Sequence, residues 1–164
     1  MVLGRLQTCQ LRYGVDKTVL NLSRASSFLK AKADQEGFGT LMQSFSAKDY
    51  AGKRLRLSGY VKSENVTRWA GLWMRVDANS GNAPQPLAFD NMQNRPIKGT
   101  SGWQRYEVVL DVPESAVGIA FGILLDGPGE VWLNSLEFDV MSAAVETTGK
   151  SMLPEGPRNL GFDH

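Results

Sequence analysis

The sequence predicts one all-β domain, an antiparallel sandwich or barrel of about eight strands. Three observations support this fold class. Apolar and polar residues alternate along many segments, which is the period of half-buried strands. Turn residues recur at short, regular intervals between these segments, and no segment has the period of an amphipathic helix. With 164 residues, the chain is long enough to bury a core within one domain.

The two clearest strands span residues 53–61 and 103–112. In the first, KRLRLSGYV, the predicted inward positions are Leu55, Leu57, Gly59 and Val61. In the second, WQRYEVVLDV, they are Tyr106, Val108, Leu110 and Val112. Pro113 ends the second strand, because proline cannot donate a hydrogen bond to a neighbouring strand.

Residues 117–125 are apolar at positions of both faces, which predicts a central strand covered on both sides. The sequence DGPG at 126–129 predicts a tight turn, and residues 131–140 form the returning strand. Together the two strands predict a hairpin. The inward residues of the returning strand are predicted to be Trp132, Leu136, Phe138 and Val140.

The remaining segments follow the same scheme with weaker patterns. Further strands are predicted at residues 15–22, 27–33, 38–45 and 68–77, and long loops at 78–86 and 90–99. Long loops on a β-scaffold are common places for function. The domain is predicted to span residues 13–141, between an N-terminal extension at 1–12 and an extended tail or linker at 142–164.

Charge and composition exclude several functions. Lys and Arg total 18 against 17 Asp and Glu, so the chain has no large field to attract nucleic acid or an anionic membrane. No apolar run approaches the roughly 20 residues of a membrane-spanning helix. Cys9 is the single cysteine, and residues 1–10 lack the pattern of a secretory signal, so a cytoplasmic location is expected. Cys9 has no candidate base, because the single histidine is His164.

Several strings, in order along the chain, resemble an uncharacterised group of bacterial jelly-roll modules with the topology of carbohydrate-binding modules and galactose-binding-like domains. They are GFGTLMQSF, YAGKRLRLSGYVK, AGLWMRVD, LAFDNM, GTSGWQRYEVVLDVP and FGILLDGPGEVWLNSLEFDV. The resemblance covers residues 13–140 and implies an antiparallel jelly-roll β-sandwich. Such modules accompany helix-turn-helix regulators of the arabinose-regulator type, and sometimes secreted hydrolases.

One departure from this group concerns the chain ends. The NLGFE-like string and Gly-Trp pair that usually open such a module are missing from the N-terminus. A similar string, NLGFD, lies at residues 159–163. Two interpretations stay open: the chain is cut from a larger protein whose next module begins in the tail, or the tail supplies an edge strand.

A row of side chains on the strand at 68–77 predicts a ligand site. Trp69, Trp73 and Arg75 share one face, because side chains alternate along a strand, and Gly71 leaves space above the backbone. A flat indole with hydrogen-bonding neighbours suits a sugar ring or another planar ligand. The competing interpretation places this face in the sandwich core, or has Trp69 cover a loop. It is favoured for Trp69, and the two interpretations are balanced for Trp73.

Polar residues after the apolar segment 87–89 extend the predicted site. Asp90 and Asn91 are predicted to meet Arg75, with a structural ion pair or an Asx turn as the equal alternative. Arg95 is predicted at the rim, and Gln43 contributes only as the resemblance implies. The predicted ligand-binding residues are therefore Trp73, Arg75, Asp90, Asn91, Gln43, Arg95 and Trp69. Trp103 and Trp132 are assigned to the core or its edge.

Catalytic signatures are missing from the sequence. It contains no GxSxG motif, phosphate loop or metal-ligand cluster, and Glu137 with Asp139 is read as a solvated pair, so no cofactor and no metal are predicted. Asp77 and Asp90 flank the first long loop and are the weak basis for a glycosidase.

Three functions follow from these observations. The first is a non-catalytic ligand-binding or sensory module with a carbohydrate-like or other small polar ligand, part of a larger regulatory or enzymatic protein. The second is a structural or dimerisation domain of a regulator, a homodimer without a small ligand. The third, held last, is a small hydrolase acting on polysaccharide.

Overall fold

The computed structural model describes residues 2–5, 11–21, 25–32 and 36–151. Within them the chain forms strands only, all paired antiparallel. The strands are β1 (Val2–Arg5), β2 (Leu11–Asp16), β3 (Ser26–Ala31), β4 (Phe38–Ser46), β5 (Lys53–Asn79), β6 (Pro84–Asp90), β7 (Ile97–Val112), β8 (Gly118–Asp126), β9 (Gly129–Met141) and β10 (Lys150–Ser151). The described residues contain no helix long and apolar enough to cross a membrane.

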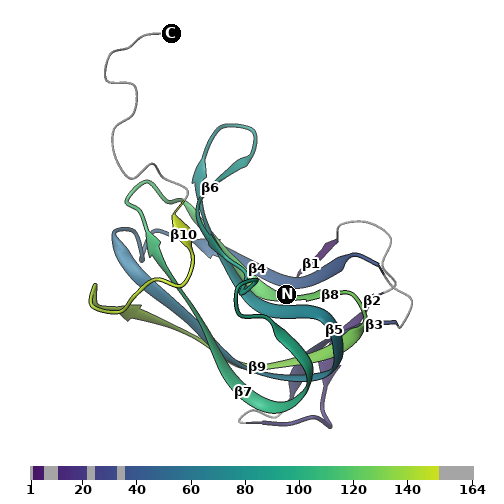
Figure 1. Ribbon diagram of the computed structural model, residues 1–164. Coiled ribbons are helices and arrows are strands. Elements are labelled where there is room, and N and C mark those ends of the chain that lie inside the picture. Colours follow the sequence, from purple (N-terminus) through teal and green to yellow (C-terminus); the bar gives the residue numbers. More distant parts are fainter. Residues whose placement is uncertain (1, 6–10, 22–24, 33–35, 152–164) are drawn as a thin grey trace.

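The strands form two layers that share β5 (Figure 1). In the first sheet the order is β1-β4-β8-β5-β6-β10, and in the second it is β7-β5-β9-β3-β2. The first half of β5 pairs with β7 and β9, and its second half pairs with β8 and β6. Register shifts between Val61 and Ala70 mark the bend where β5 passes from one sheet to the other.

One apolar core fills the space between the sheets. The predicted inward positions of residues 53–61 and 103–112 are confirmed, because Leu55, Leu57, Val61, Val108 and Leu110 are buried in it. The predicted central strand is also confirmed: β8 lies between β4 and β5, and residues 119–125 are buried on both faces. Its apolar residues therefore cover the core on one side and the outer face of the first sheet on the other.

The predicted hairpin of β8 and β9 is wrong. The turn at 126–129 joins these strands, but both pair with β5 and neither pairs with the other. The physical reason is the bend of β5. Strand β8 pairs with the second half of β5 in the first sheet, and β9 pairs with the first half of β5 in the second sheet. The turn packs against this bend: a Cβ on Gly129, whose φ is 137°, would lie 2.7 Å from the Cα of Val66.

Trp132 faces outward, which corrects its predicted inward position. Val131 and Leu133 fill the core beside it. A β-bulge then shifts the register of β9 against β5, and Ser135 takes a φ of 55° there. Because a bulge adds one residue to the alternation, Leu136 and Phe138 do pack against the core. Val140, also predicted inward, is 54% exposed.

Other predicted boundaries move as well. The strand expected at 15–22 is β2, which ends at Asp16 because its carboxylate accepts hydrogen bonds from the amides of Thr18 and Val19. The strand expected at 68–77 is the second half of β5. Most of the predicted loop at 78–86 belongs to a hairpin formed by the end of β5 and the start of β6. Pro84 and Pro86 fit the free edge of β6, because β10 pairs only with Ala88 and Phe89 further along that strand. The 90–99 loop shortens to residues 91–96.

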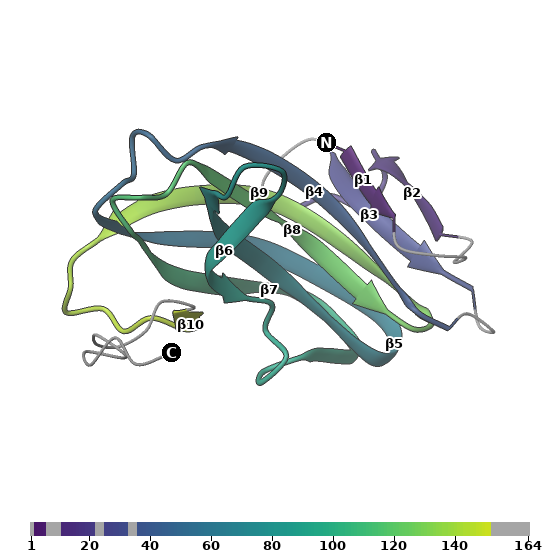
Figure 2. The same ribbon diagram turned by 90° about the horizontal axis from the view of Figure 1, so that it is seen from above.

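Pairings reach beyond the predicted domain bounds of 13 and 141. Strand β1 pairs with β4 (Figure 2), and β10 pairs with β6. Cys9, Ala33, the NLGFD string and His164 lie outside the described residues.

Asp16 ties β2 to the outer face of Trp132. The indole Nε1 donates to Asp16 Oδ2 at 3.2 Å, and Lys62 Nζ lies 5.0 Å from the ring centroid. Hydrogen bonds from the hydroxyl and amide of Thr18, and then from Trp132, lower the pKa of Asp16 from 3.8 to about 2. The ionised carboxylate therefore stabilises this edge of the fold.

A pH titration should detect this carboxylate. Because the folded-state pKa is lowered, its stabilisation is fully present above the ordinary pKa of about 4 and is lost as the pH falls through about 2. We expect the melting temperature to fall less steeply between pH 4 and pH 2 in Asp16→Asn than in the unsubstituted protein. Parallel curves for the two proteins would contradict the assignment.

Candidate functional site

A cavity of about 630 Å³ lies on the outer face of the first sheet. Strand register brings its floor together, because Thr40, Leu124 and Gly71 form one cross-strand row and Met42, Gly122 and Trp73 form the next. The start of β4, the middle of β5, the end of β8, and the end of β6 with the loop after it supply the walls. The cavity therefore depends on segments that are far apart in the sequence.

Trp73 forms the floor of this cavity. It packs on Ala120 and Leu124 in a small apolar cluster separate from the main core, with Trp69 and Phe89 at its border. The Trp73 indole Nε1 donates to Thr40 Oγ1 at 2.7 Å, and that hydroxyl donates to the carbonyl of Ile123 at 2.8 Å. Trp73 thus faces away from the sandwich core and is only 7% exposed, because its neighbours on this face cover it.

Three further aromatic side chains surround the floor. Trp69 and Phe89 are half-buried, and Phe38 is 41% exposed. The sequence indicated Trp69 through its spacing from Trp73. Phe38 and Phe89 were missed, because only the pairing of β4 and β6 with their neighbours places them on this face.

Arg75 holds the middle of the outer face. Its Nε donates to both Asp77 carboxylate oxygens, at 2.8 and 3.0 Å, and its side chain is 34% exposed. Its two terminal nitrogens have no hydrogen-bond partner among the described residues. A second hollow of about 560 Å³ begins here and shares Met42 and Arg75 with the cavity. Arg75 can therefore donate hydrogen bonds to a ligand in either hollow.

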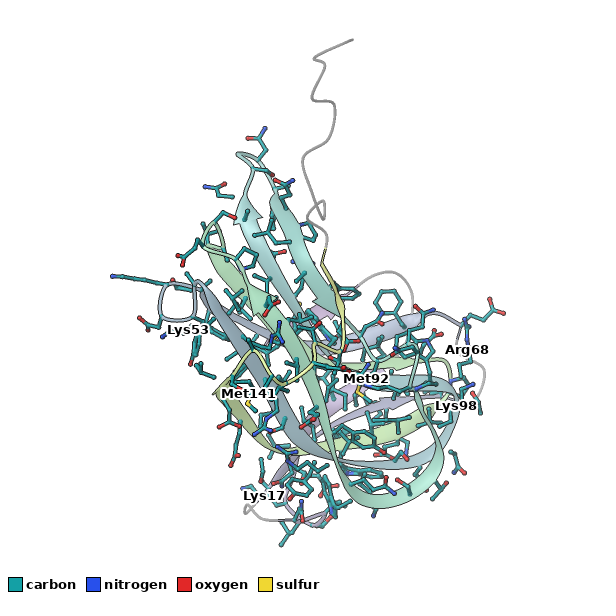
Figure 3. The ribbon with its side chains drawn as sticks, turned by 60° about the vertical axis from the view of Figure 1, so that its left-hand side comes forward. Lys17, Lys53, Arg68, Met92, Lys98 and Met141 are labelled. Atoms are coloured by element: carbon teal, nitrogen blue, oxygen red, sulfur yellow. The ribbon has the colours of Figure 1, made fainter. Side chains whose placement is uncertain are left out.

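The opposite end of the cavity carries a second ion pair. Arg68 Nε lies 3.1 Å from Asp126 Oδ2, with side chains 55% and 13% exposed. Figure 3 shows Arg68 at the margin of the molecule and Met92 within it. The sequence did not indicate this pair, because the two residues come together only through the register of β5 against β8.

The loop that follows β6 brings Asn91 to the cavity and fills the space above Gly71. A Cβ on Gly71 would lie 2.7 Å from the carbonyl oxygen of Asn91 and 2.9 Å from the Cβ of Met92. The predicted open space above Gly71 is therefore wrong, because this close approach of the loop occupies it. Asn91 itself lines the cavity, as predicted for a site residue.

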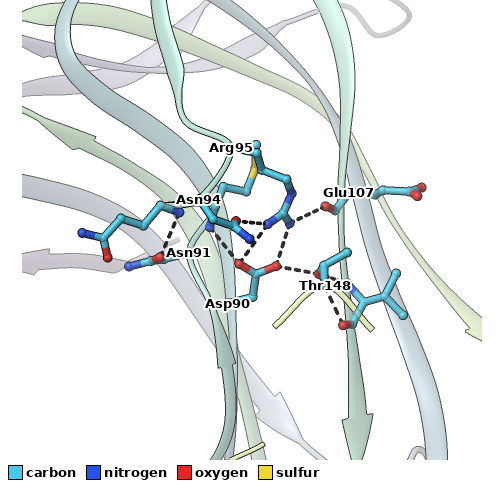
Figure 4. A network of polar contacts seen from close by, with 9 residues as sticks. Asp90, Asn91, Asn94, Arg95, Glu107 and Thr148 are labelled. Carbon is cyan, nitrogen blue, oxygen red and sulfur yellow. Dashed lines mark hydrogen bonds and ion pairs between the residues drawn. The ribbon is translucent and has the colours of Figure 1, made fainter. Parts of the chain in front are cut away.

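Asp90 does not meet Arg75, so that predicted contact is wrong. Asp90 pairs in register with Met74, which places it on the opposite face of the sheet from Arg75. Its carboxylate binds Arg95 at 2.6 Å (Figure 4). Arg95 accordingly does not reach the cavity rim. The alternative interpretation, a structural ion pair with an Asx turn, describes Asp90, whose carboxylate also accepts from the amide of Met92.

Gln43 also lies apart from the cavity. It is in register with Phe121 and Met74, whose side chains belong to the core, so it lies on the core-facing side of β4. Its side chain is exposed, because the pairing of β4 with β1 ends one residue earlier, at Met42. Met42, the preceding residue, points to the opposite face of the sheet and lines the cavity.

The acidic residues that the sequence singled out do not come together in the described part of the chain. Asp77 and Asp90 lie on opposite faces of the first sheet and each is paired with an arginine, so they cannot act together on one glycosidic bond. Asp139 pairs with Arg56 at 2.9 Å. Among the residues that the structure describes, no cluster of three His, Cys, Asp or Glu side chains is placed to hold a metal ion.

Trp103 and Trp132 lie on the second sheet, away from the cavity. The Trp103 Nε1 donates to the carbonyl of Leu20 at 3.0 Å, and Trp132 is 5% exposed beneath Lys62. Both indole nitrogens are therefore used in contacts within the protein.

Comparison with known proteins gives one curated relative and a group of structural neighbours. No model of a known protein family matches the chain. It is 42% identical over 167 residues to YbfP, an uncharacterized HTH-type transcriptional regulator of Bacillus subtilis (strain 168). The match covers 99% of this chain and 56% of the regulator, so the chain spans about half the length of that relative.

Several of the structural neighbours are carbohydrate-binding modules, and others belong to carbohydrate-active enzymes such as an arabinofuranosidase. The CBM22-1 xylan-binding domain of Xyn10C from Paenibacillus barcinonensis has a TM-score of 0.54 and 17% identity, covering 83% of this chain and 86% of that domain. A family 16 carbohydrate-binding module gives 0.58 and 8%, covering 77% and 84%. A family 30 module gives 0.56 and 14%, covering 79% and 83%.

These likenesses confirm the predicted fold class, an antiparallel jelly-roll β-sandwich. The resemblance read from the sequence is also confirmed in both parts, since the chain resembles carbohydrate-binding modules in fold and a helix-turn-helix regulator in sequence.

Proposed function

We propose that this chain is a non-catalytic ligand-binding module of a larger regulatory protein, and that a carbohydrate binds in the cavity above Trp73. One observation carries the proposal: an aromatic-walled cavity of about 630 Å³ is bordered by an arginine with two unused donor nitrogens. That volume is within the range of small-molecule sites.

The cavity supplies the two kinds of contact that a sugar ring needs. The apolar C–H face of a sugar packs on an aromatic ring, for which Trp69 and Phe38 offer partly exposed surfaces. Sugar hydroxyls accept and donate hydrogen bonds, and Arg75 and Asn91 provide donors at the opposite wall. Because Asp77 fixes the Nε of Arg75, the guanidinium is oriented before a ligand arrives, which lowers the entropic cost of binding.

The regulatory part of the proposal rests on the similarity to the Bacillus subtilis regulator. A module of this kind would sense a sugar and pass its occupancy to a DNA-binding part of the same protein. The chain's own charge, with 18 basic and 17 acidic residues, favours contact with DNA through another part.

Removing the Trp69 side chain should test the site. We expect a glycan array to identify a ligand, with xylan fragments as the first probes because a structural neighbour is a xylan-binding domain. Calorimetry should then show that Trp69→Ala weakens binding about 30-fold, which corresponds to about 2 kcal/mol. Trp103→Ala is the matched control, because Trp103 is a half-buried indole on the other sheet.

Two results would contradict the proposal. One is an array without any bound glycan. The other is a detected affinity that Trp69→Ala leaves equal to that of the control.

A second candidate function, self-association, is favoured by the edge strand β2. Its outer edge is unpaired within the described residues, and Tyr13 and Val15 are 52% and 64% exposed. A twofold pairing of β2 with a second copy would cover both side chains. Light scattering should then give the mass of a dimer and Val15→Lys that of a monomer, whereas a monomeric unsubstituted chain would remove this candidate.

A further inference from the structure

The C-terminal segment, residues 142–151, folds back onto the domain after β9 (Figure 2). The Arg54 guanidinium donates to the carbonyls of Ala143 and Val145. Two hydrogen bonds join Thr148 to Val109: the Thr148 amide donates to the Val109 carbonyl at 2.9 Å, and the Val109 amide donates to Thr148 Oγ1 at 2.8 Å. Strand β10 then pairs with Ala88 and Phe89 of β6.

Asp90 joins this segment to the loop at 91–96. Its carboxylate is buried, with 6% of the residue exposed, and it accepts from three directions. The donors are the Met92 amide at 2.9 Å, the Arg95 guanidinium at 2.6 and 3.2 Å, and Thr148 Oγ1 at 2.5 Å (Figure 4). A charged acceptor makes each of these bonds stronger than a neutral pair. Any shift of Asp90 therefore disturbs both the loop and the segment.

The contact leaves no free space between the segment and β6. A Cβ on Gly149 would lie 2.5 Å from the carbonyl oxygen of Phe89 and 2.6 Å from the Cβ of Asp90. Thus the segment touches the backbone of Phe89, which also borders the cavity, and it cannot remain docked if β6 moves toward it.

The cavity lies on the other face of the same stretch of chain. Phe89 and Asn91 line the cavity, and Asp90 between them points to the segment, because successive side chains of a strand alternate. The loop is also fixed from the cavity side by its close approach to Gly71. A ligand that contacts Phe89 or Asn91 therefore acts on the residues that hold Asp90 in place.

We propose that Asp90 and Thr148 couple the cavity to the C-terminal segment, so that a filled cavity and a docked segment stabilise each other. The ligand half of this coupling rests on the proposed function, whereas the mechanical half concerns the loop and the segment alone. Such coupling is reciprocal: the factor by which ligand favours docking equals the factor by which docking favours ligand. It gives the module a physical means of passing cavity occupancy to a segment outside the cavity.

Hydrogen exchange on the complete chain tests the mechanical half without a ligand. Thr148→Val removes the hydroxyl but keeps the shape, and we expect about tenfold faster exchange in 143–151 and also in the loop at 91–96. Thr100→Val is the matched control, because the exposed Thr100 hydroxyl of β7 also accepts from a backbone amide, that of Asn65 in β5. Faster exchange confined to 143–151 would overturn the coupling.

A substitution beneath the loop at 91–96 tests the opposite direction. Gly71→Ala crowds Asn91 and Met92, and we expect faster exchange of the Val109 and Thr148 amides, whose hydrogen bonds join β7 to the segment. Gly59→Ala is the control for general destabilisation, since its Cβ would lie 2.6 Å from the Leu136 side chain in the other sheet. Unchanged Val109 and Thr148 amides in a folded Gly71→Ala protein would contradict the proposal. If that variant does not fold, Thr148→Val decides.

Xylohexaose is the probe for the ligand half. If it binds, we expect slower exchange in 143–151 and about a tenfold lower affinity in Thr148→Val, whereas unchanged exchange and affinity would overturn the coupling to ligand. If xylohexaose does not bind, the proposed ligand class has failed for this probe, and the two exchange experiments still decide whether the loop and the segment are coupled.

Discussion

Replacing Trp73 with alanine should lower the free energy of unfolding by about 3–5 kcal/mol, the usual cost of truncating a buried large aromatic residue. The ring covers Ala120 and Leu124 and is only 7% exposed, so its loss leaves a void in the floor of the cavity. It also leaves Thr40 Oγ1 without the indole donor. For a chain of this length, thermal unfolding should occur about 10 °C lower.

Trp73→Phe separates the two contributions to this loss. Phenylalanine keeps an aromatic ring over the sheet and removes the 2.7 Å hydrogen bond to Thr40, so we expect a cost nearer to about 1 kcal/mol. Urea unfolding of both variants measures the difference. A cost below about 1 kcal/mol for Trp73→Ala would mean that this ring is not packed as the floor of the cavity.

Replacing Asp90 with alanine should cost about 3 kcal/mol, because it leaves several polar groups unsatisfied at once. The Arg95 guanidinium loses its carboxylate partner, and the Met92 amide and the Thr148 hydroxyl lose their acceptor. Arg95 is 33% exposed, so solvent offsets part of the loss and keeps it at the lower end of the range for a buried pair. Thermal unfolding and limited proteolysis near residue 148 should both report it.

Asp111→Ala is the control for losing an aspartate that binds arginine. Asp111 pairs with Arg54 at 2.7 Å but is 58% exposed, and we expect a loss within about 1 kcal/mol. If Asp90→Ala and Asp111→Ala destabilise the protein equally, the buried Asp90 contributes no more to the free energy of unfolding than an exposed aspartate. The hydrogen-bond network around Asp90 would then contribute little to stability.

Strand periodicity predicts local structure well wherever one face is buried. The alternation in 53–61 and 103–112 assigned Leu55, Leu57, Val108 and Leu110 to the core, because a period of two requires only that the chain be extended. The same rule placed Trp69, Trp73 and Arg75 on one face. Their spacing is local, so no knowledge of the neighbouring strands was needed.

Residues on different strands could not be related in the same way. Whether Asp90 faces Arg75 depends on the register of β6 against β5, and a shift of one residue reverses the face. Asp90, Arg95 and Gln43 lie apart from the cavity, which their positions in the sequence could not show. Trp132 was placed inward because a bulge near Ser135 adds a residue that periodicity cannot detect.

The sequence by itself determined that this chain forms an antiparallel β-sandwich, and it indicated the strand that carries the indole and guanidinium groups of the candidate site. These properties follow from the order of apolar, polar and turn residues along each strand. The tertiary structure alone decided that β5 passes between two sheets and that Phe38 and Phe89 wall the cavity. It also decided that Asp90 faces away from Arg75 and accepts a hydrogen bond from Thr148. Each of these depends on pairing between distant segments, which is fixed by how the whole chain buries its core and satisfies its hydrogen bonds.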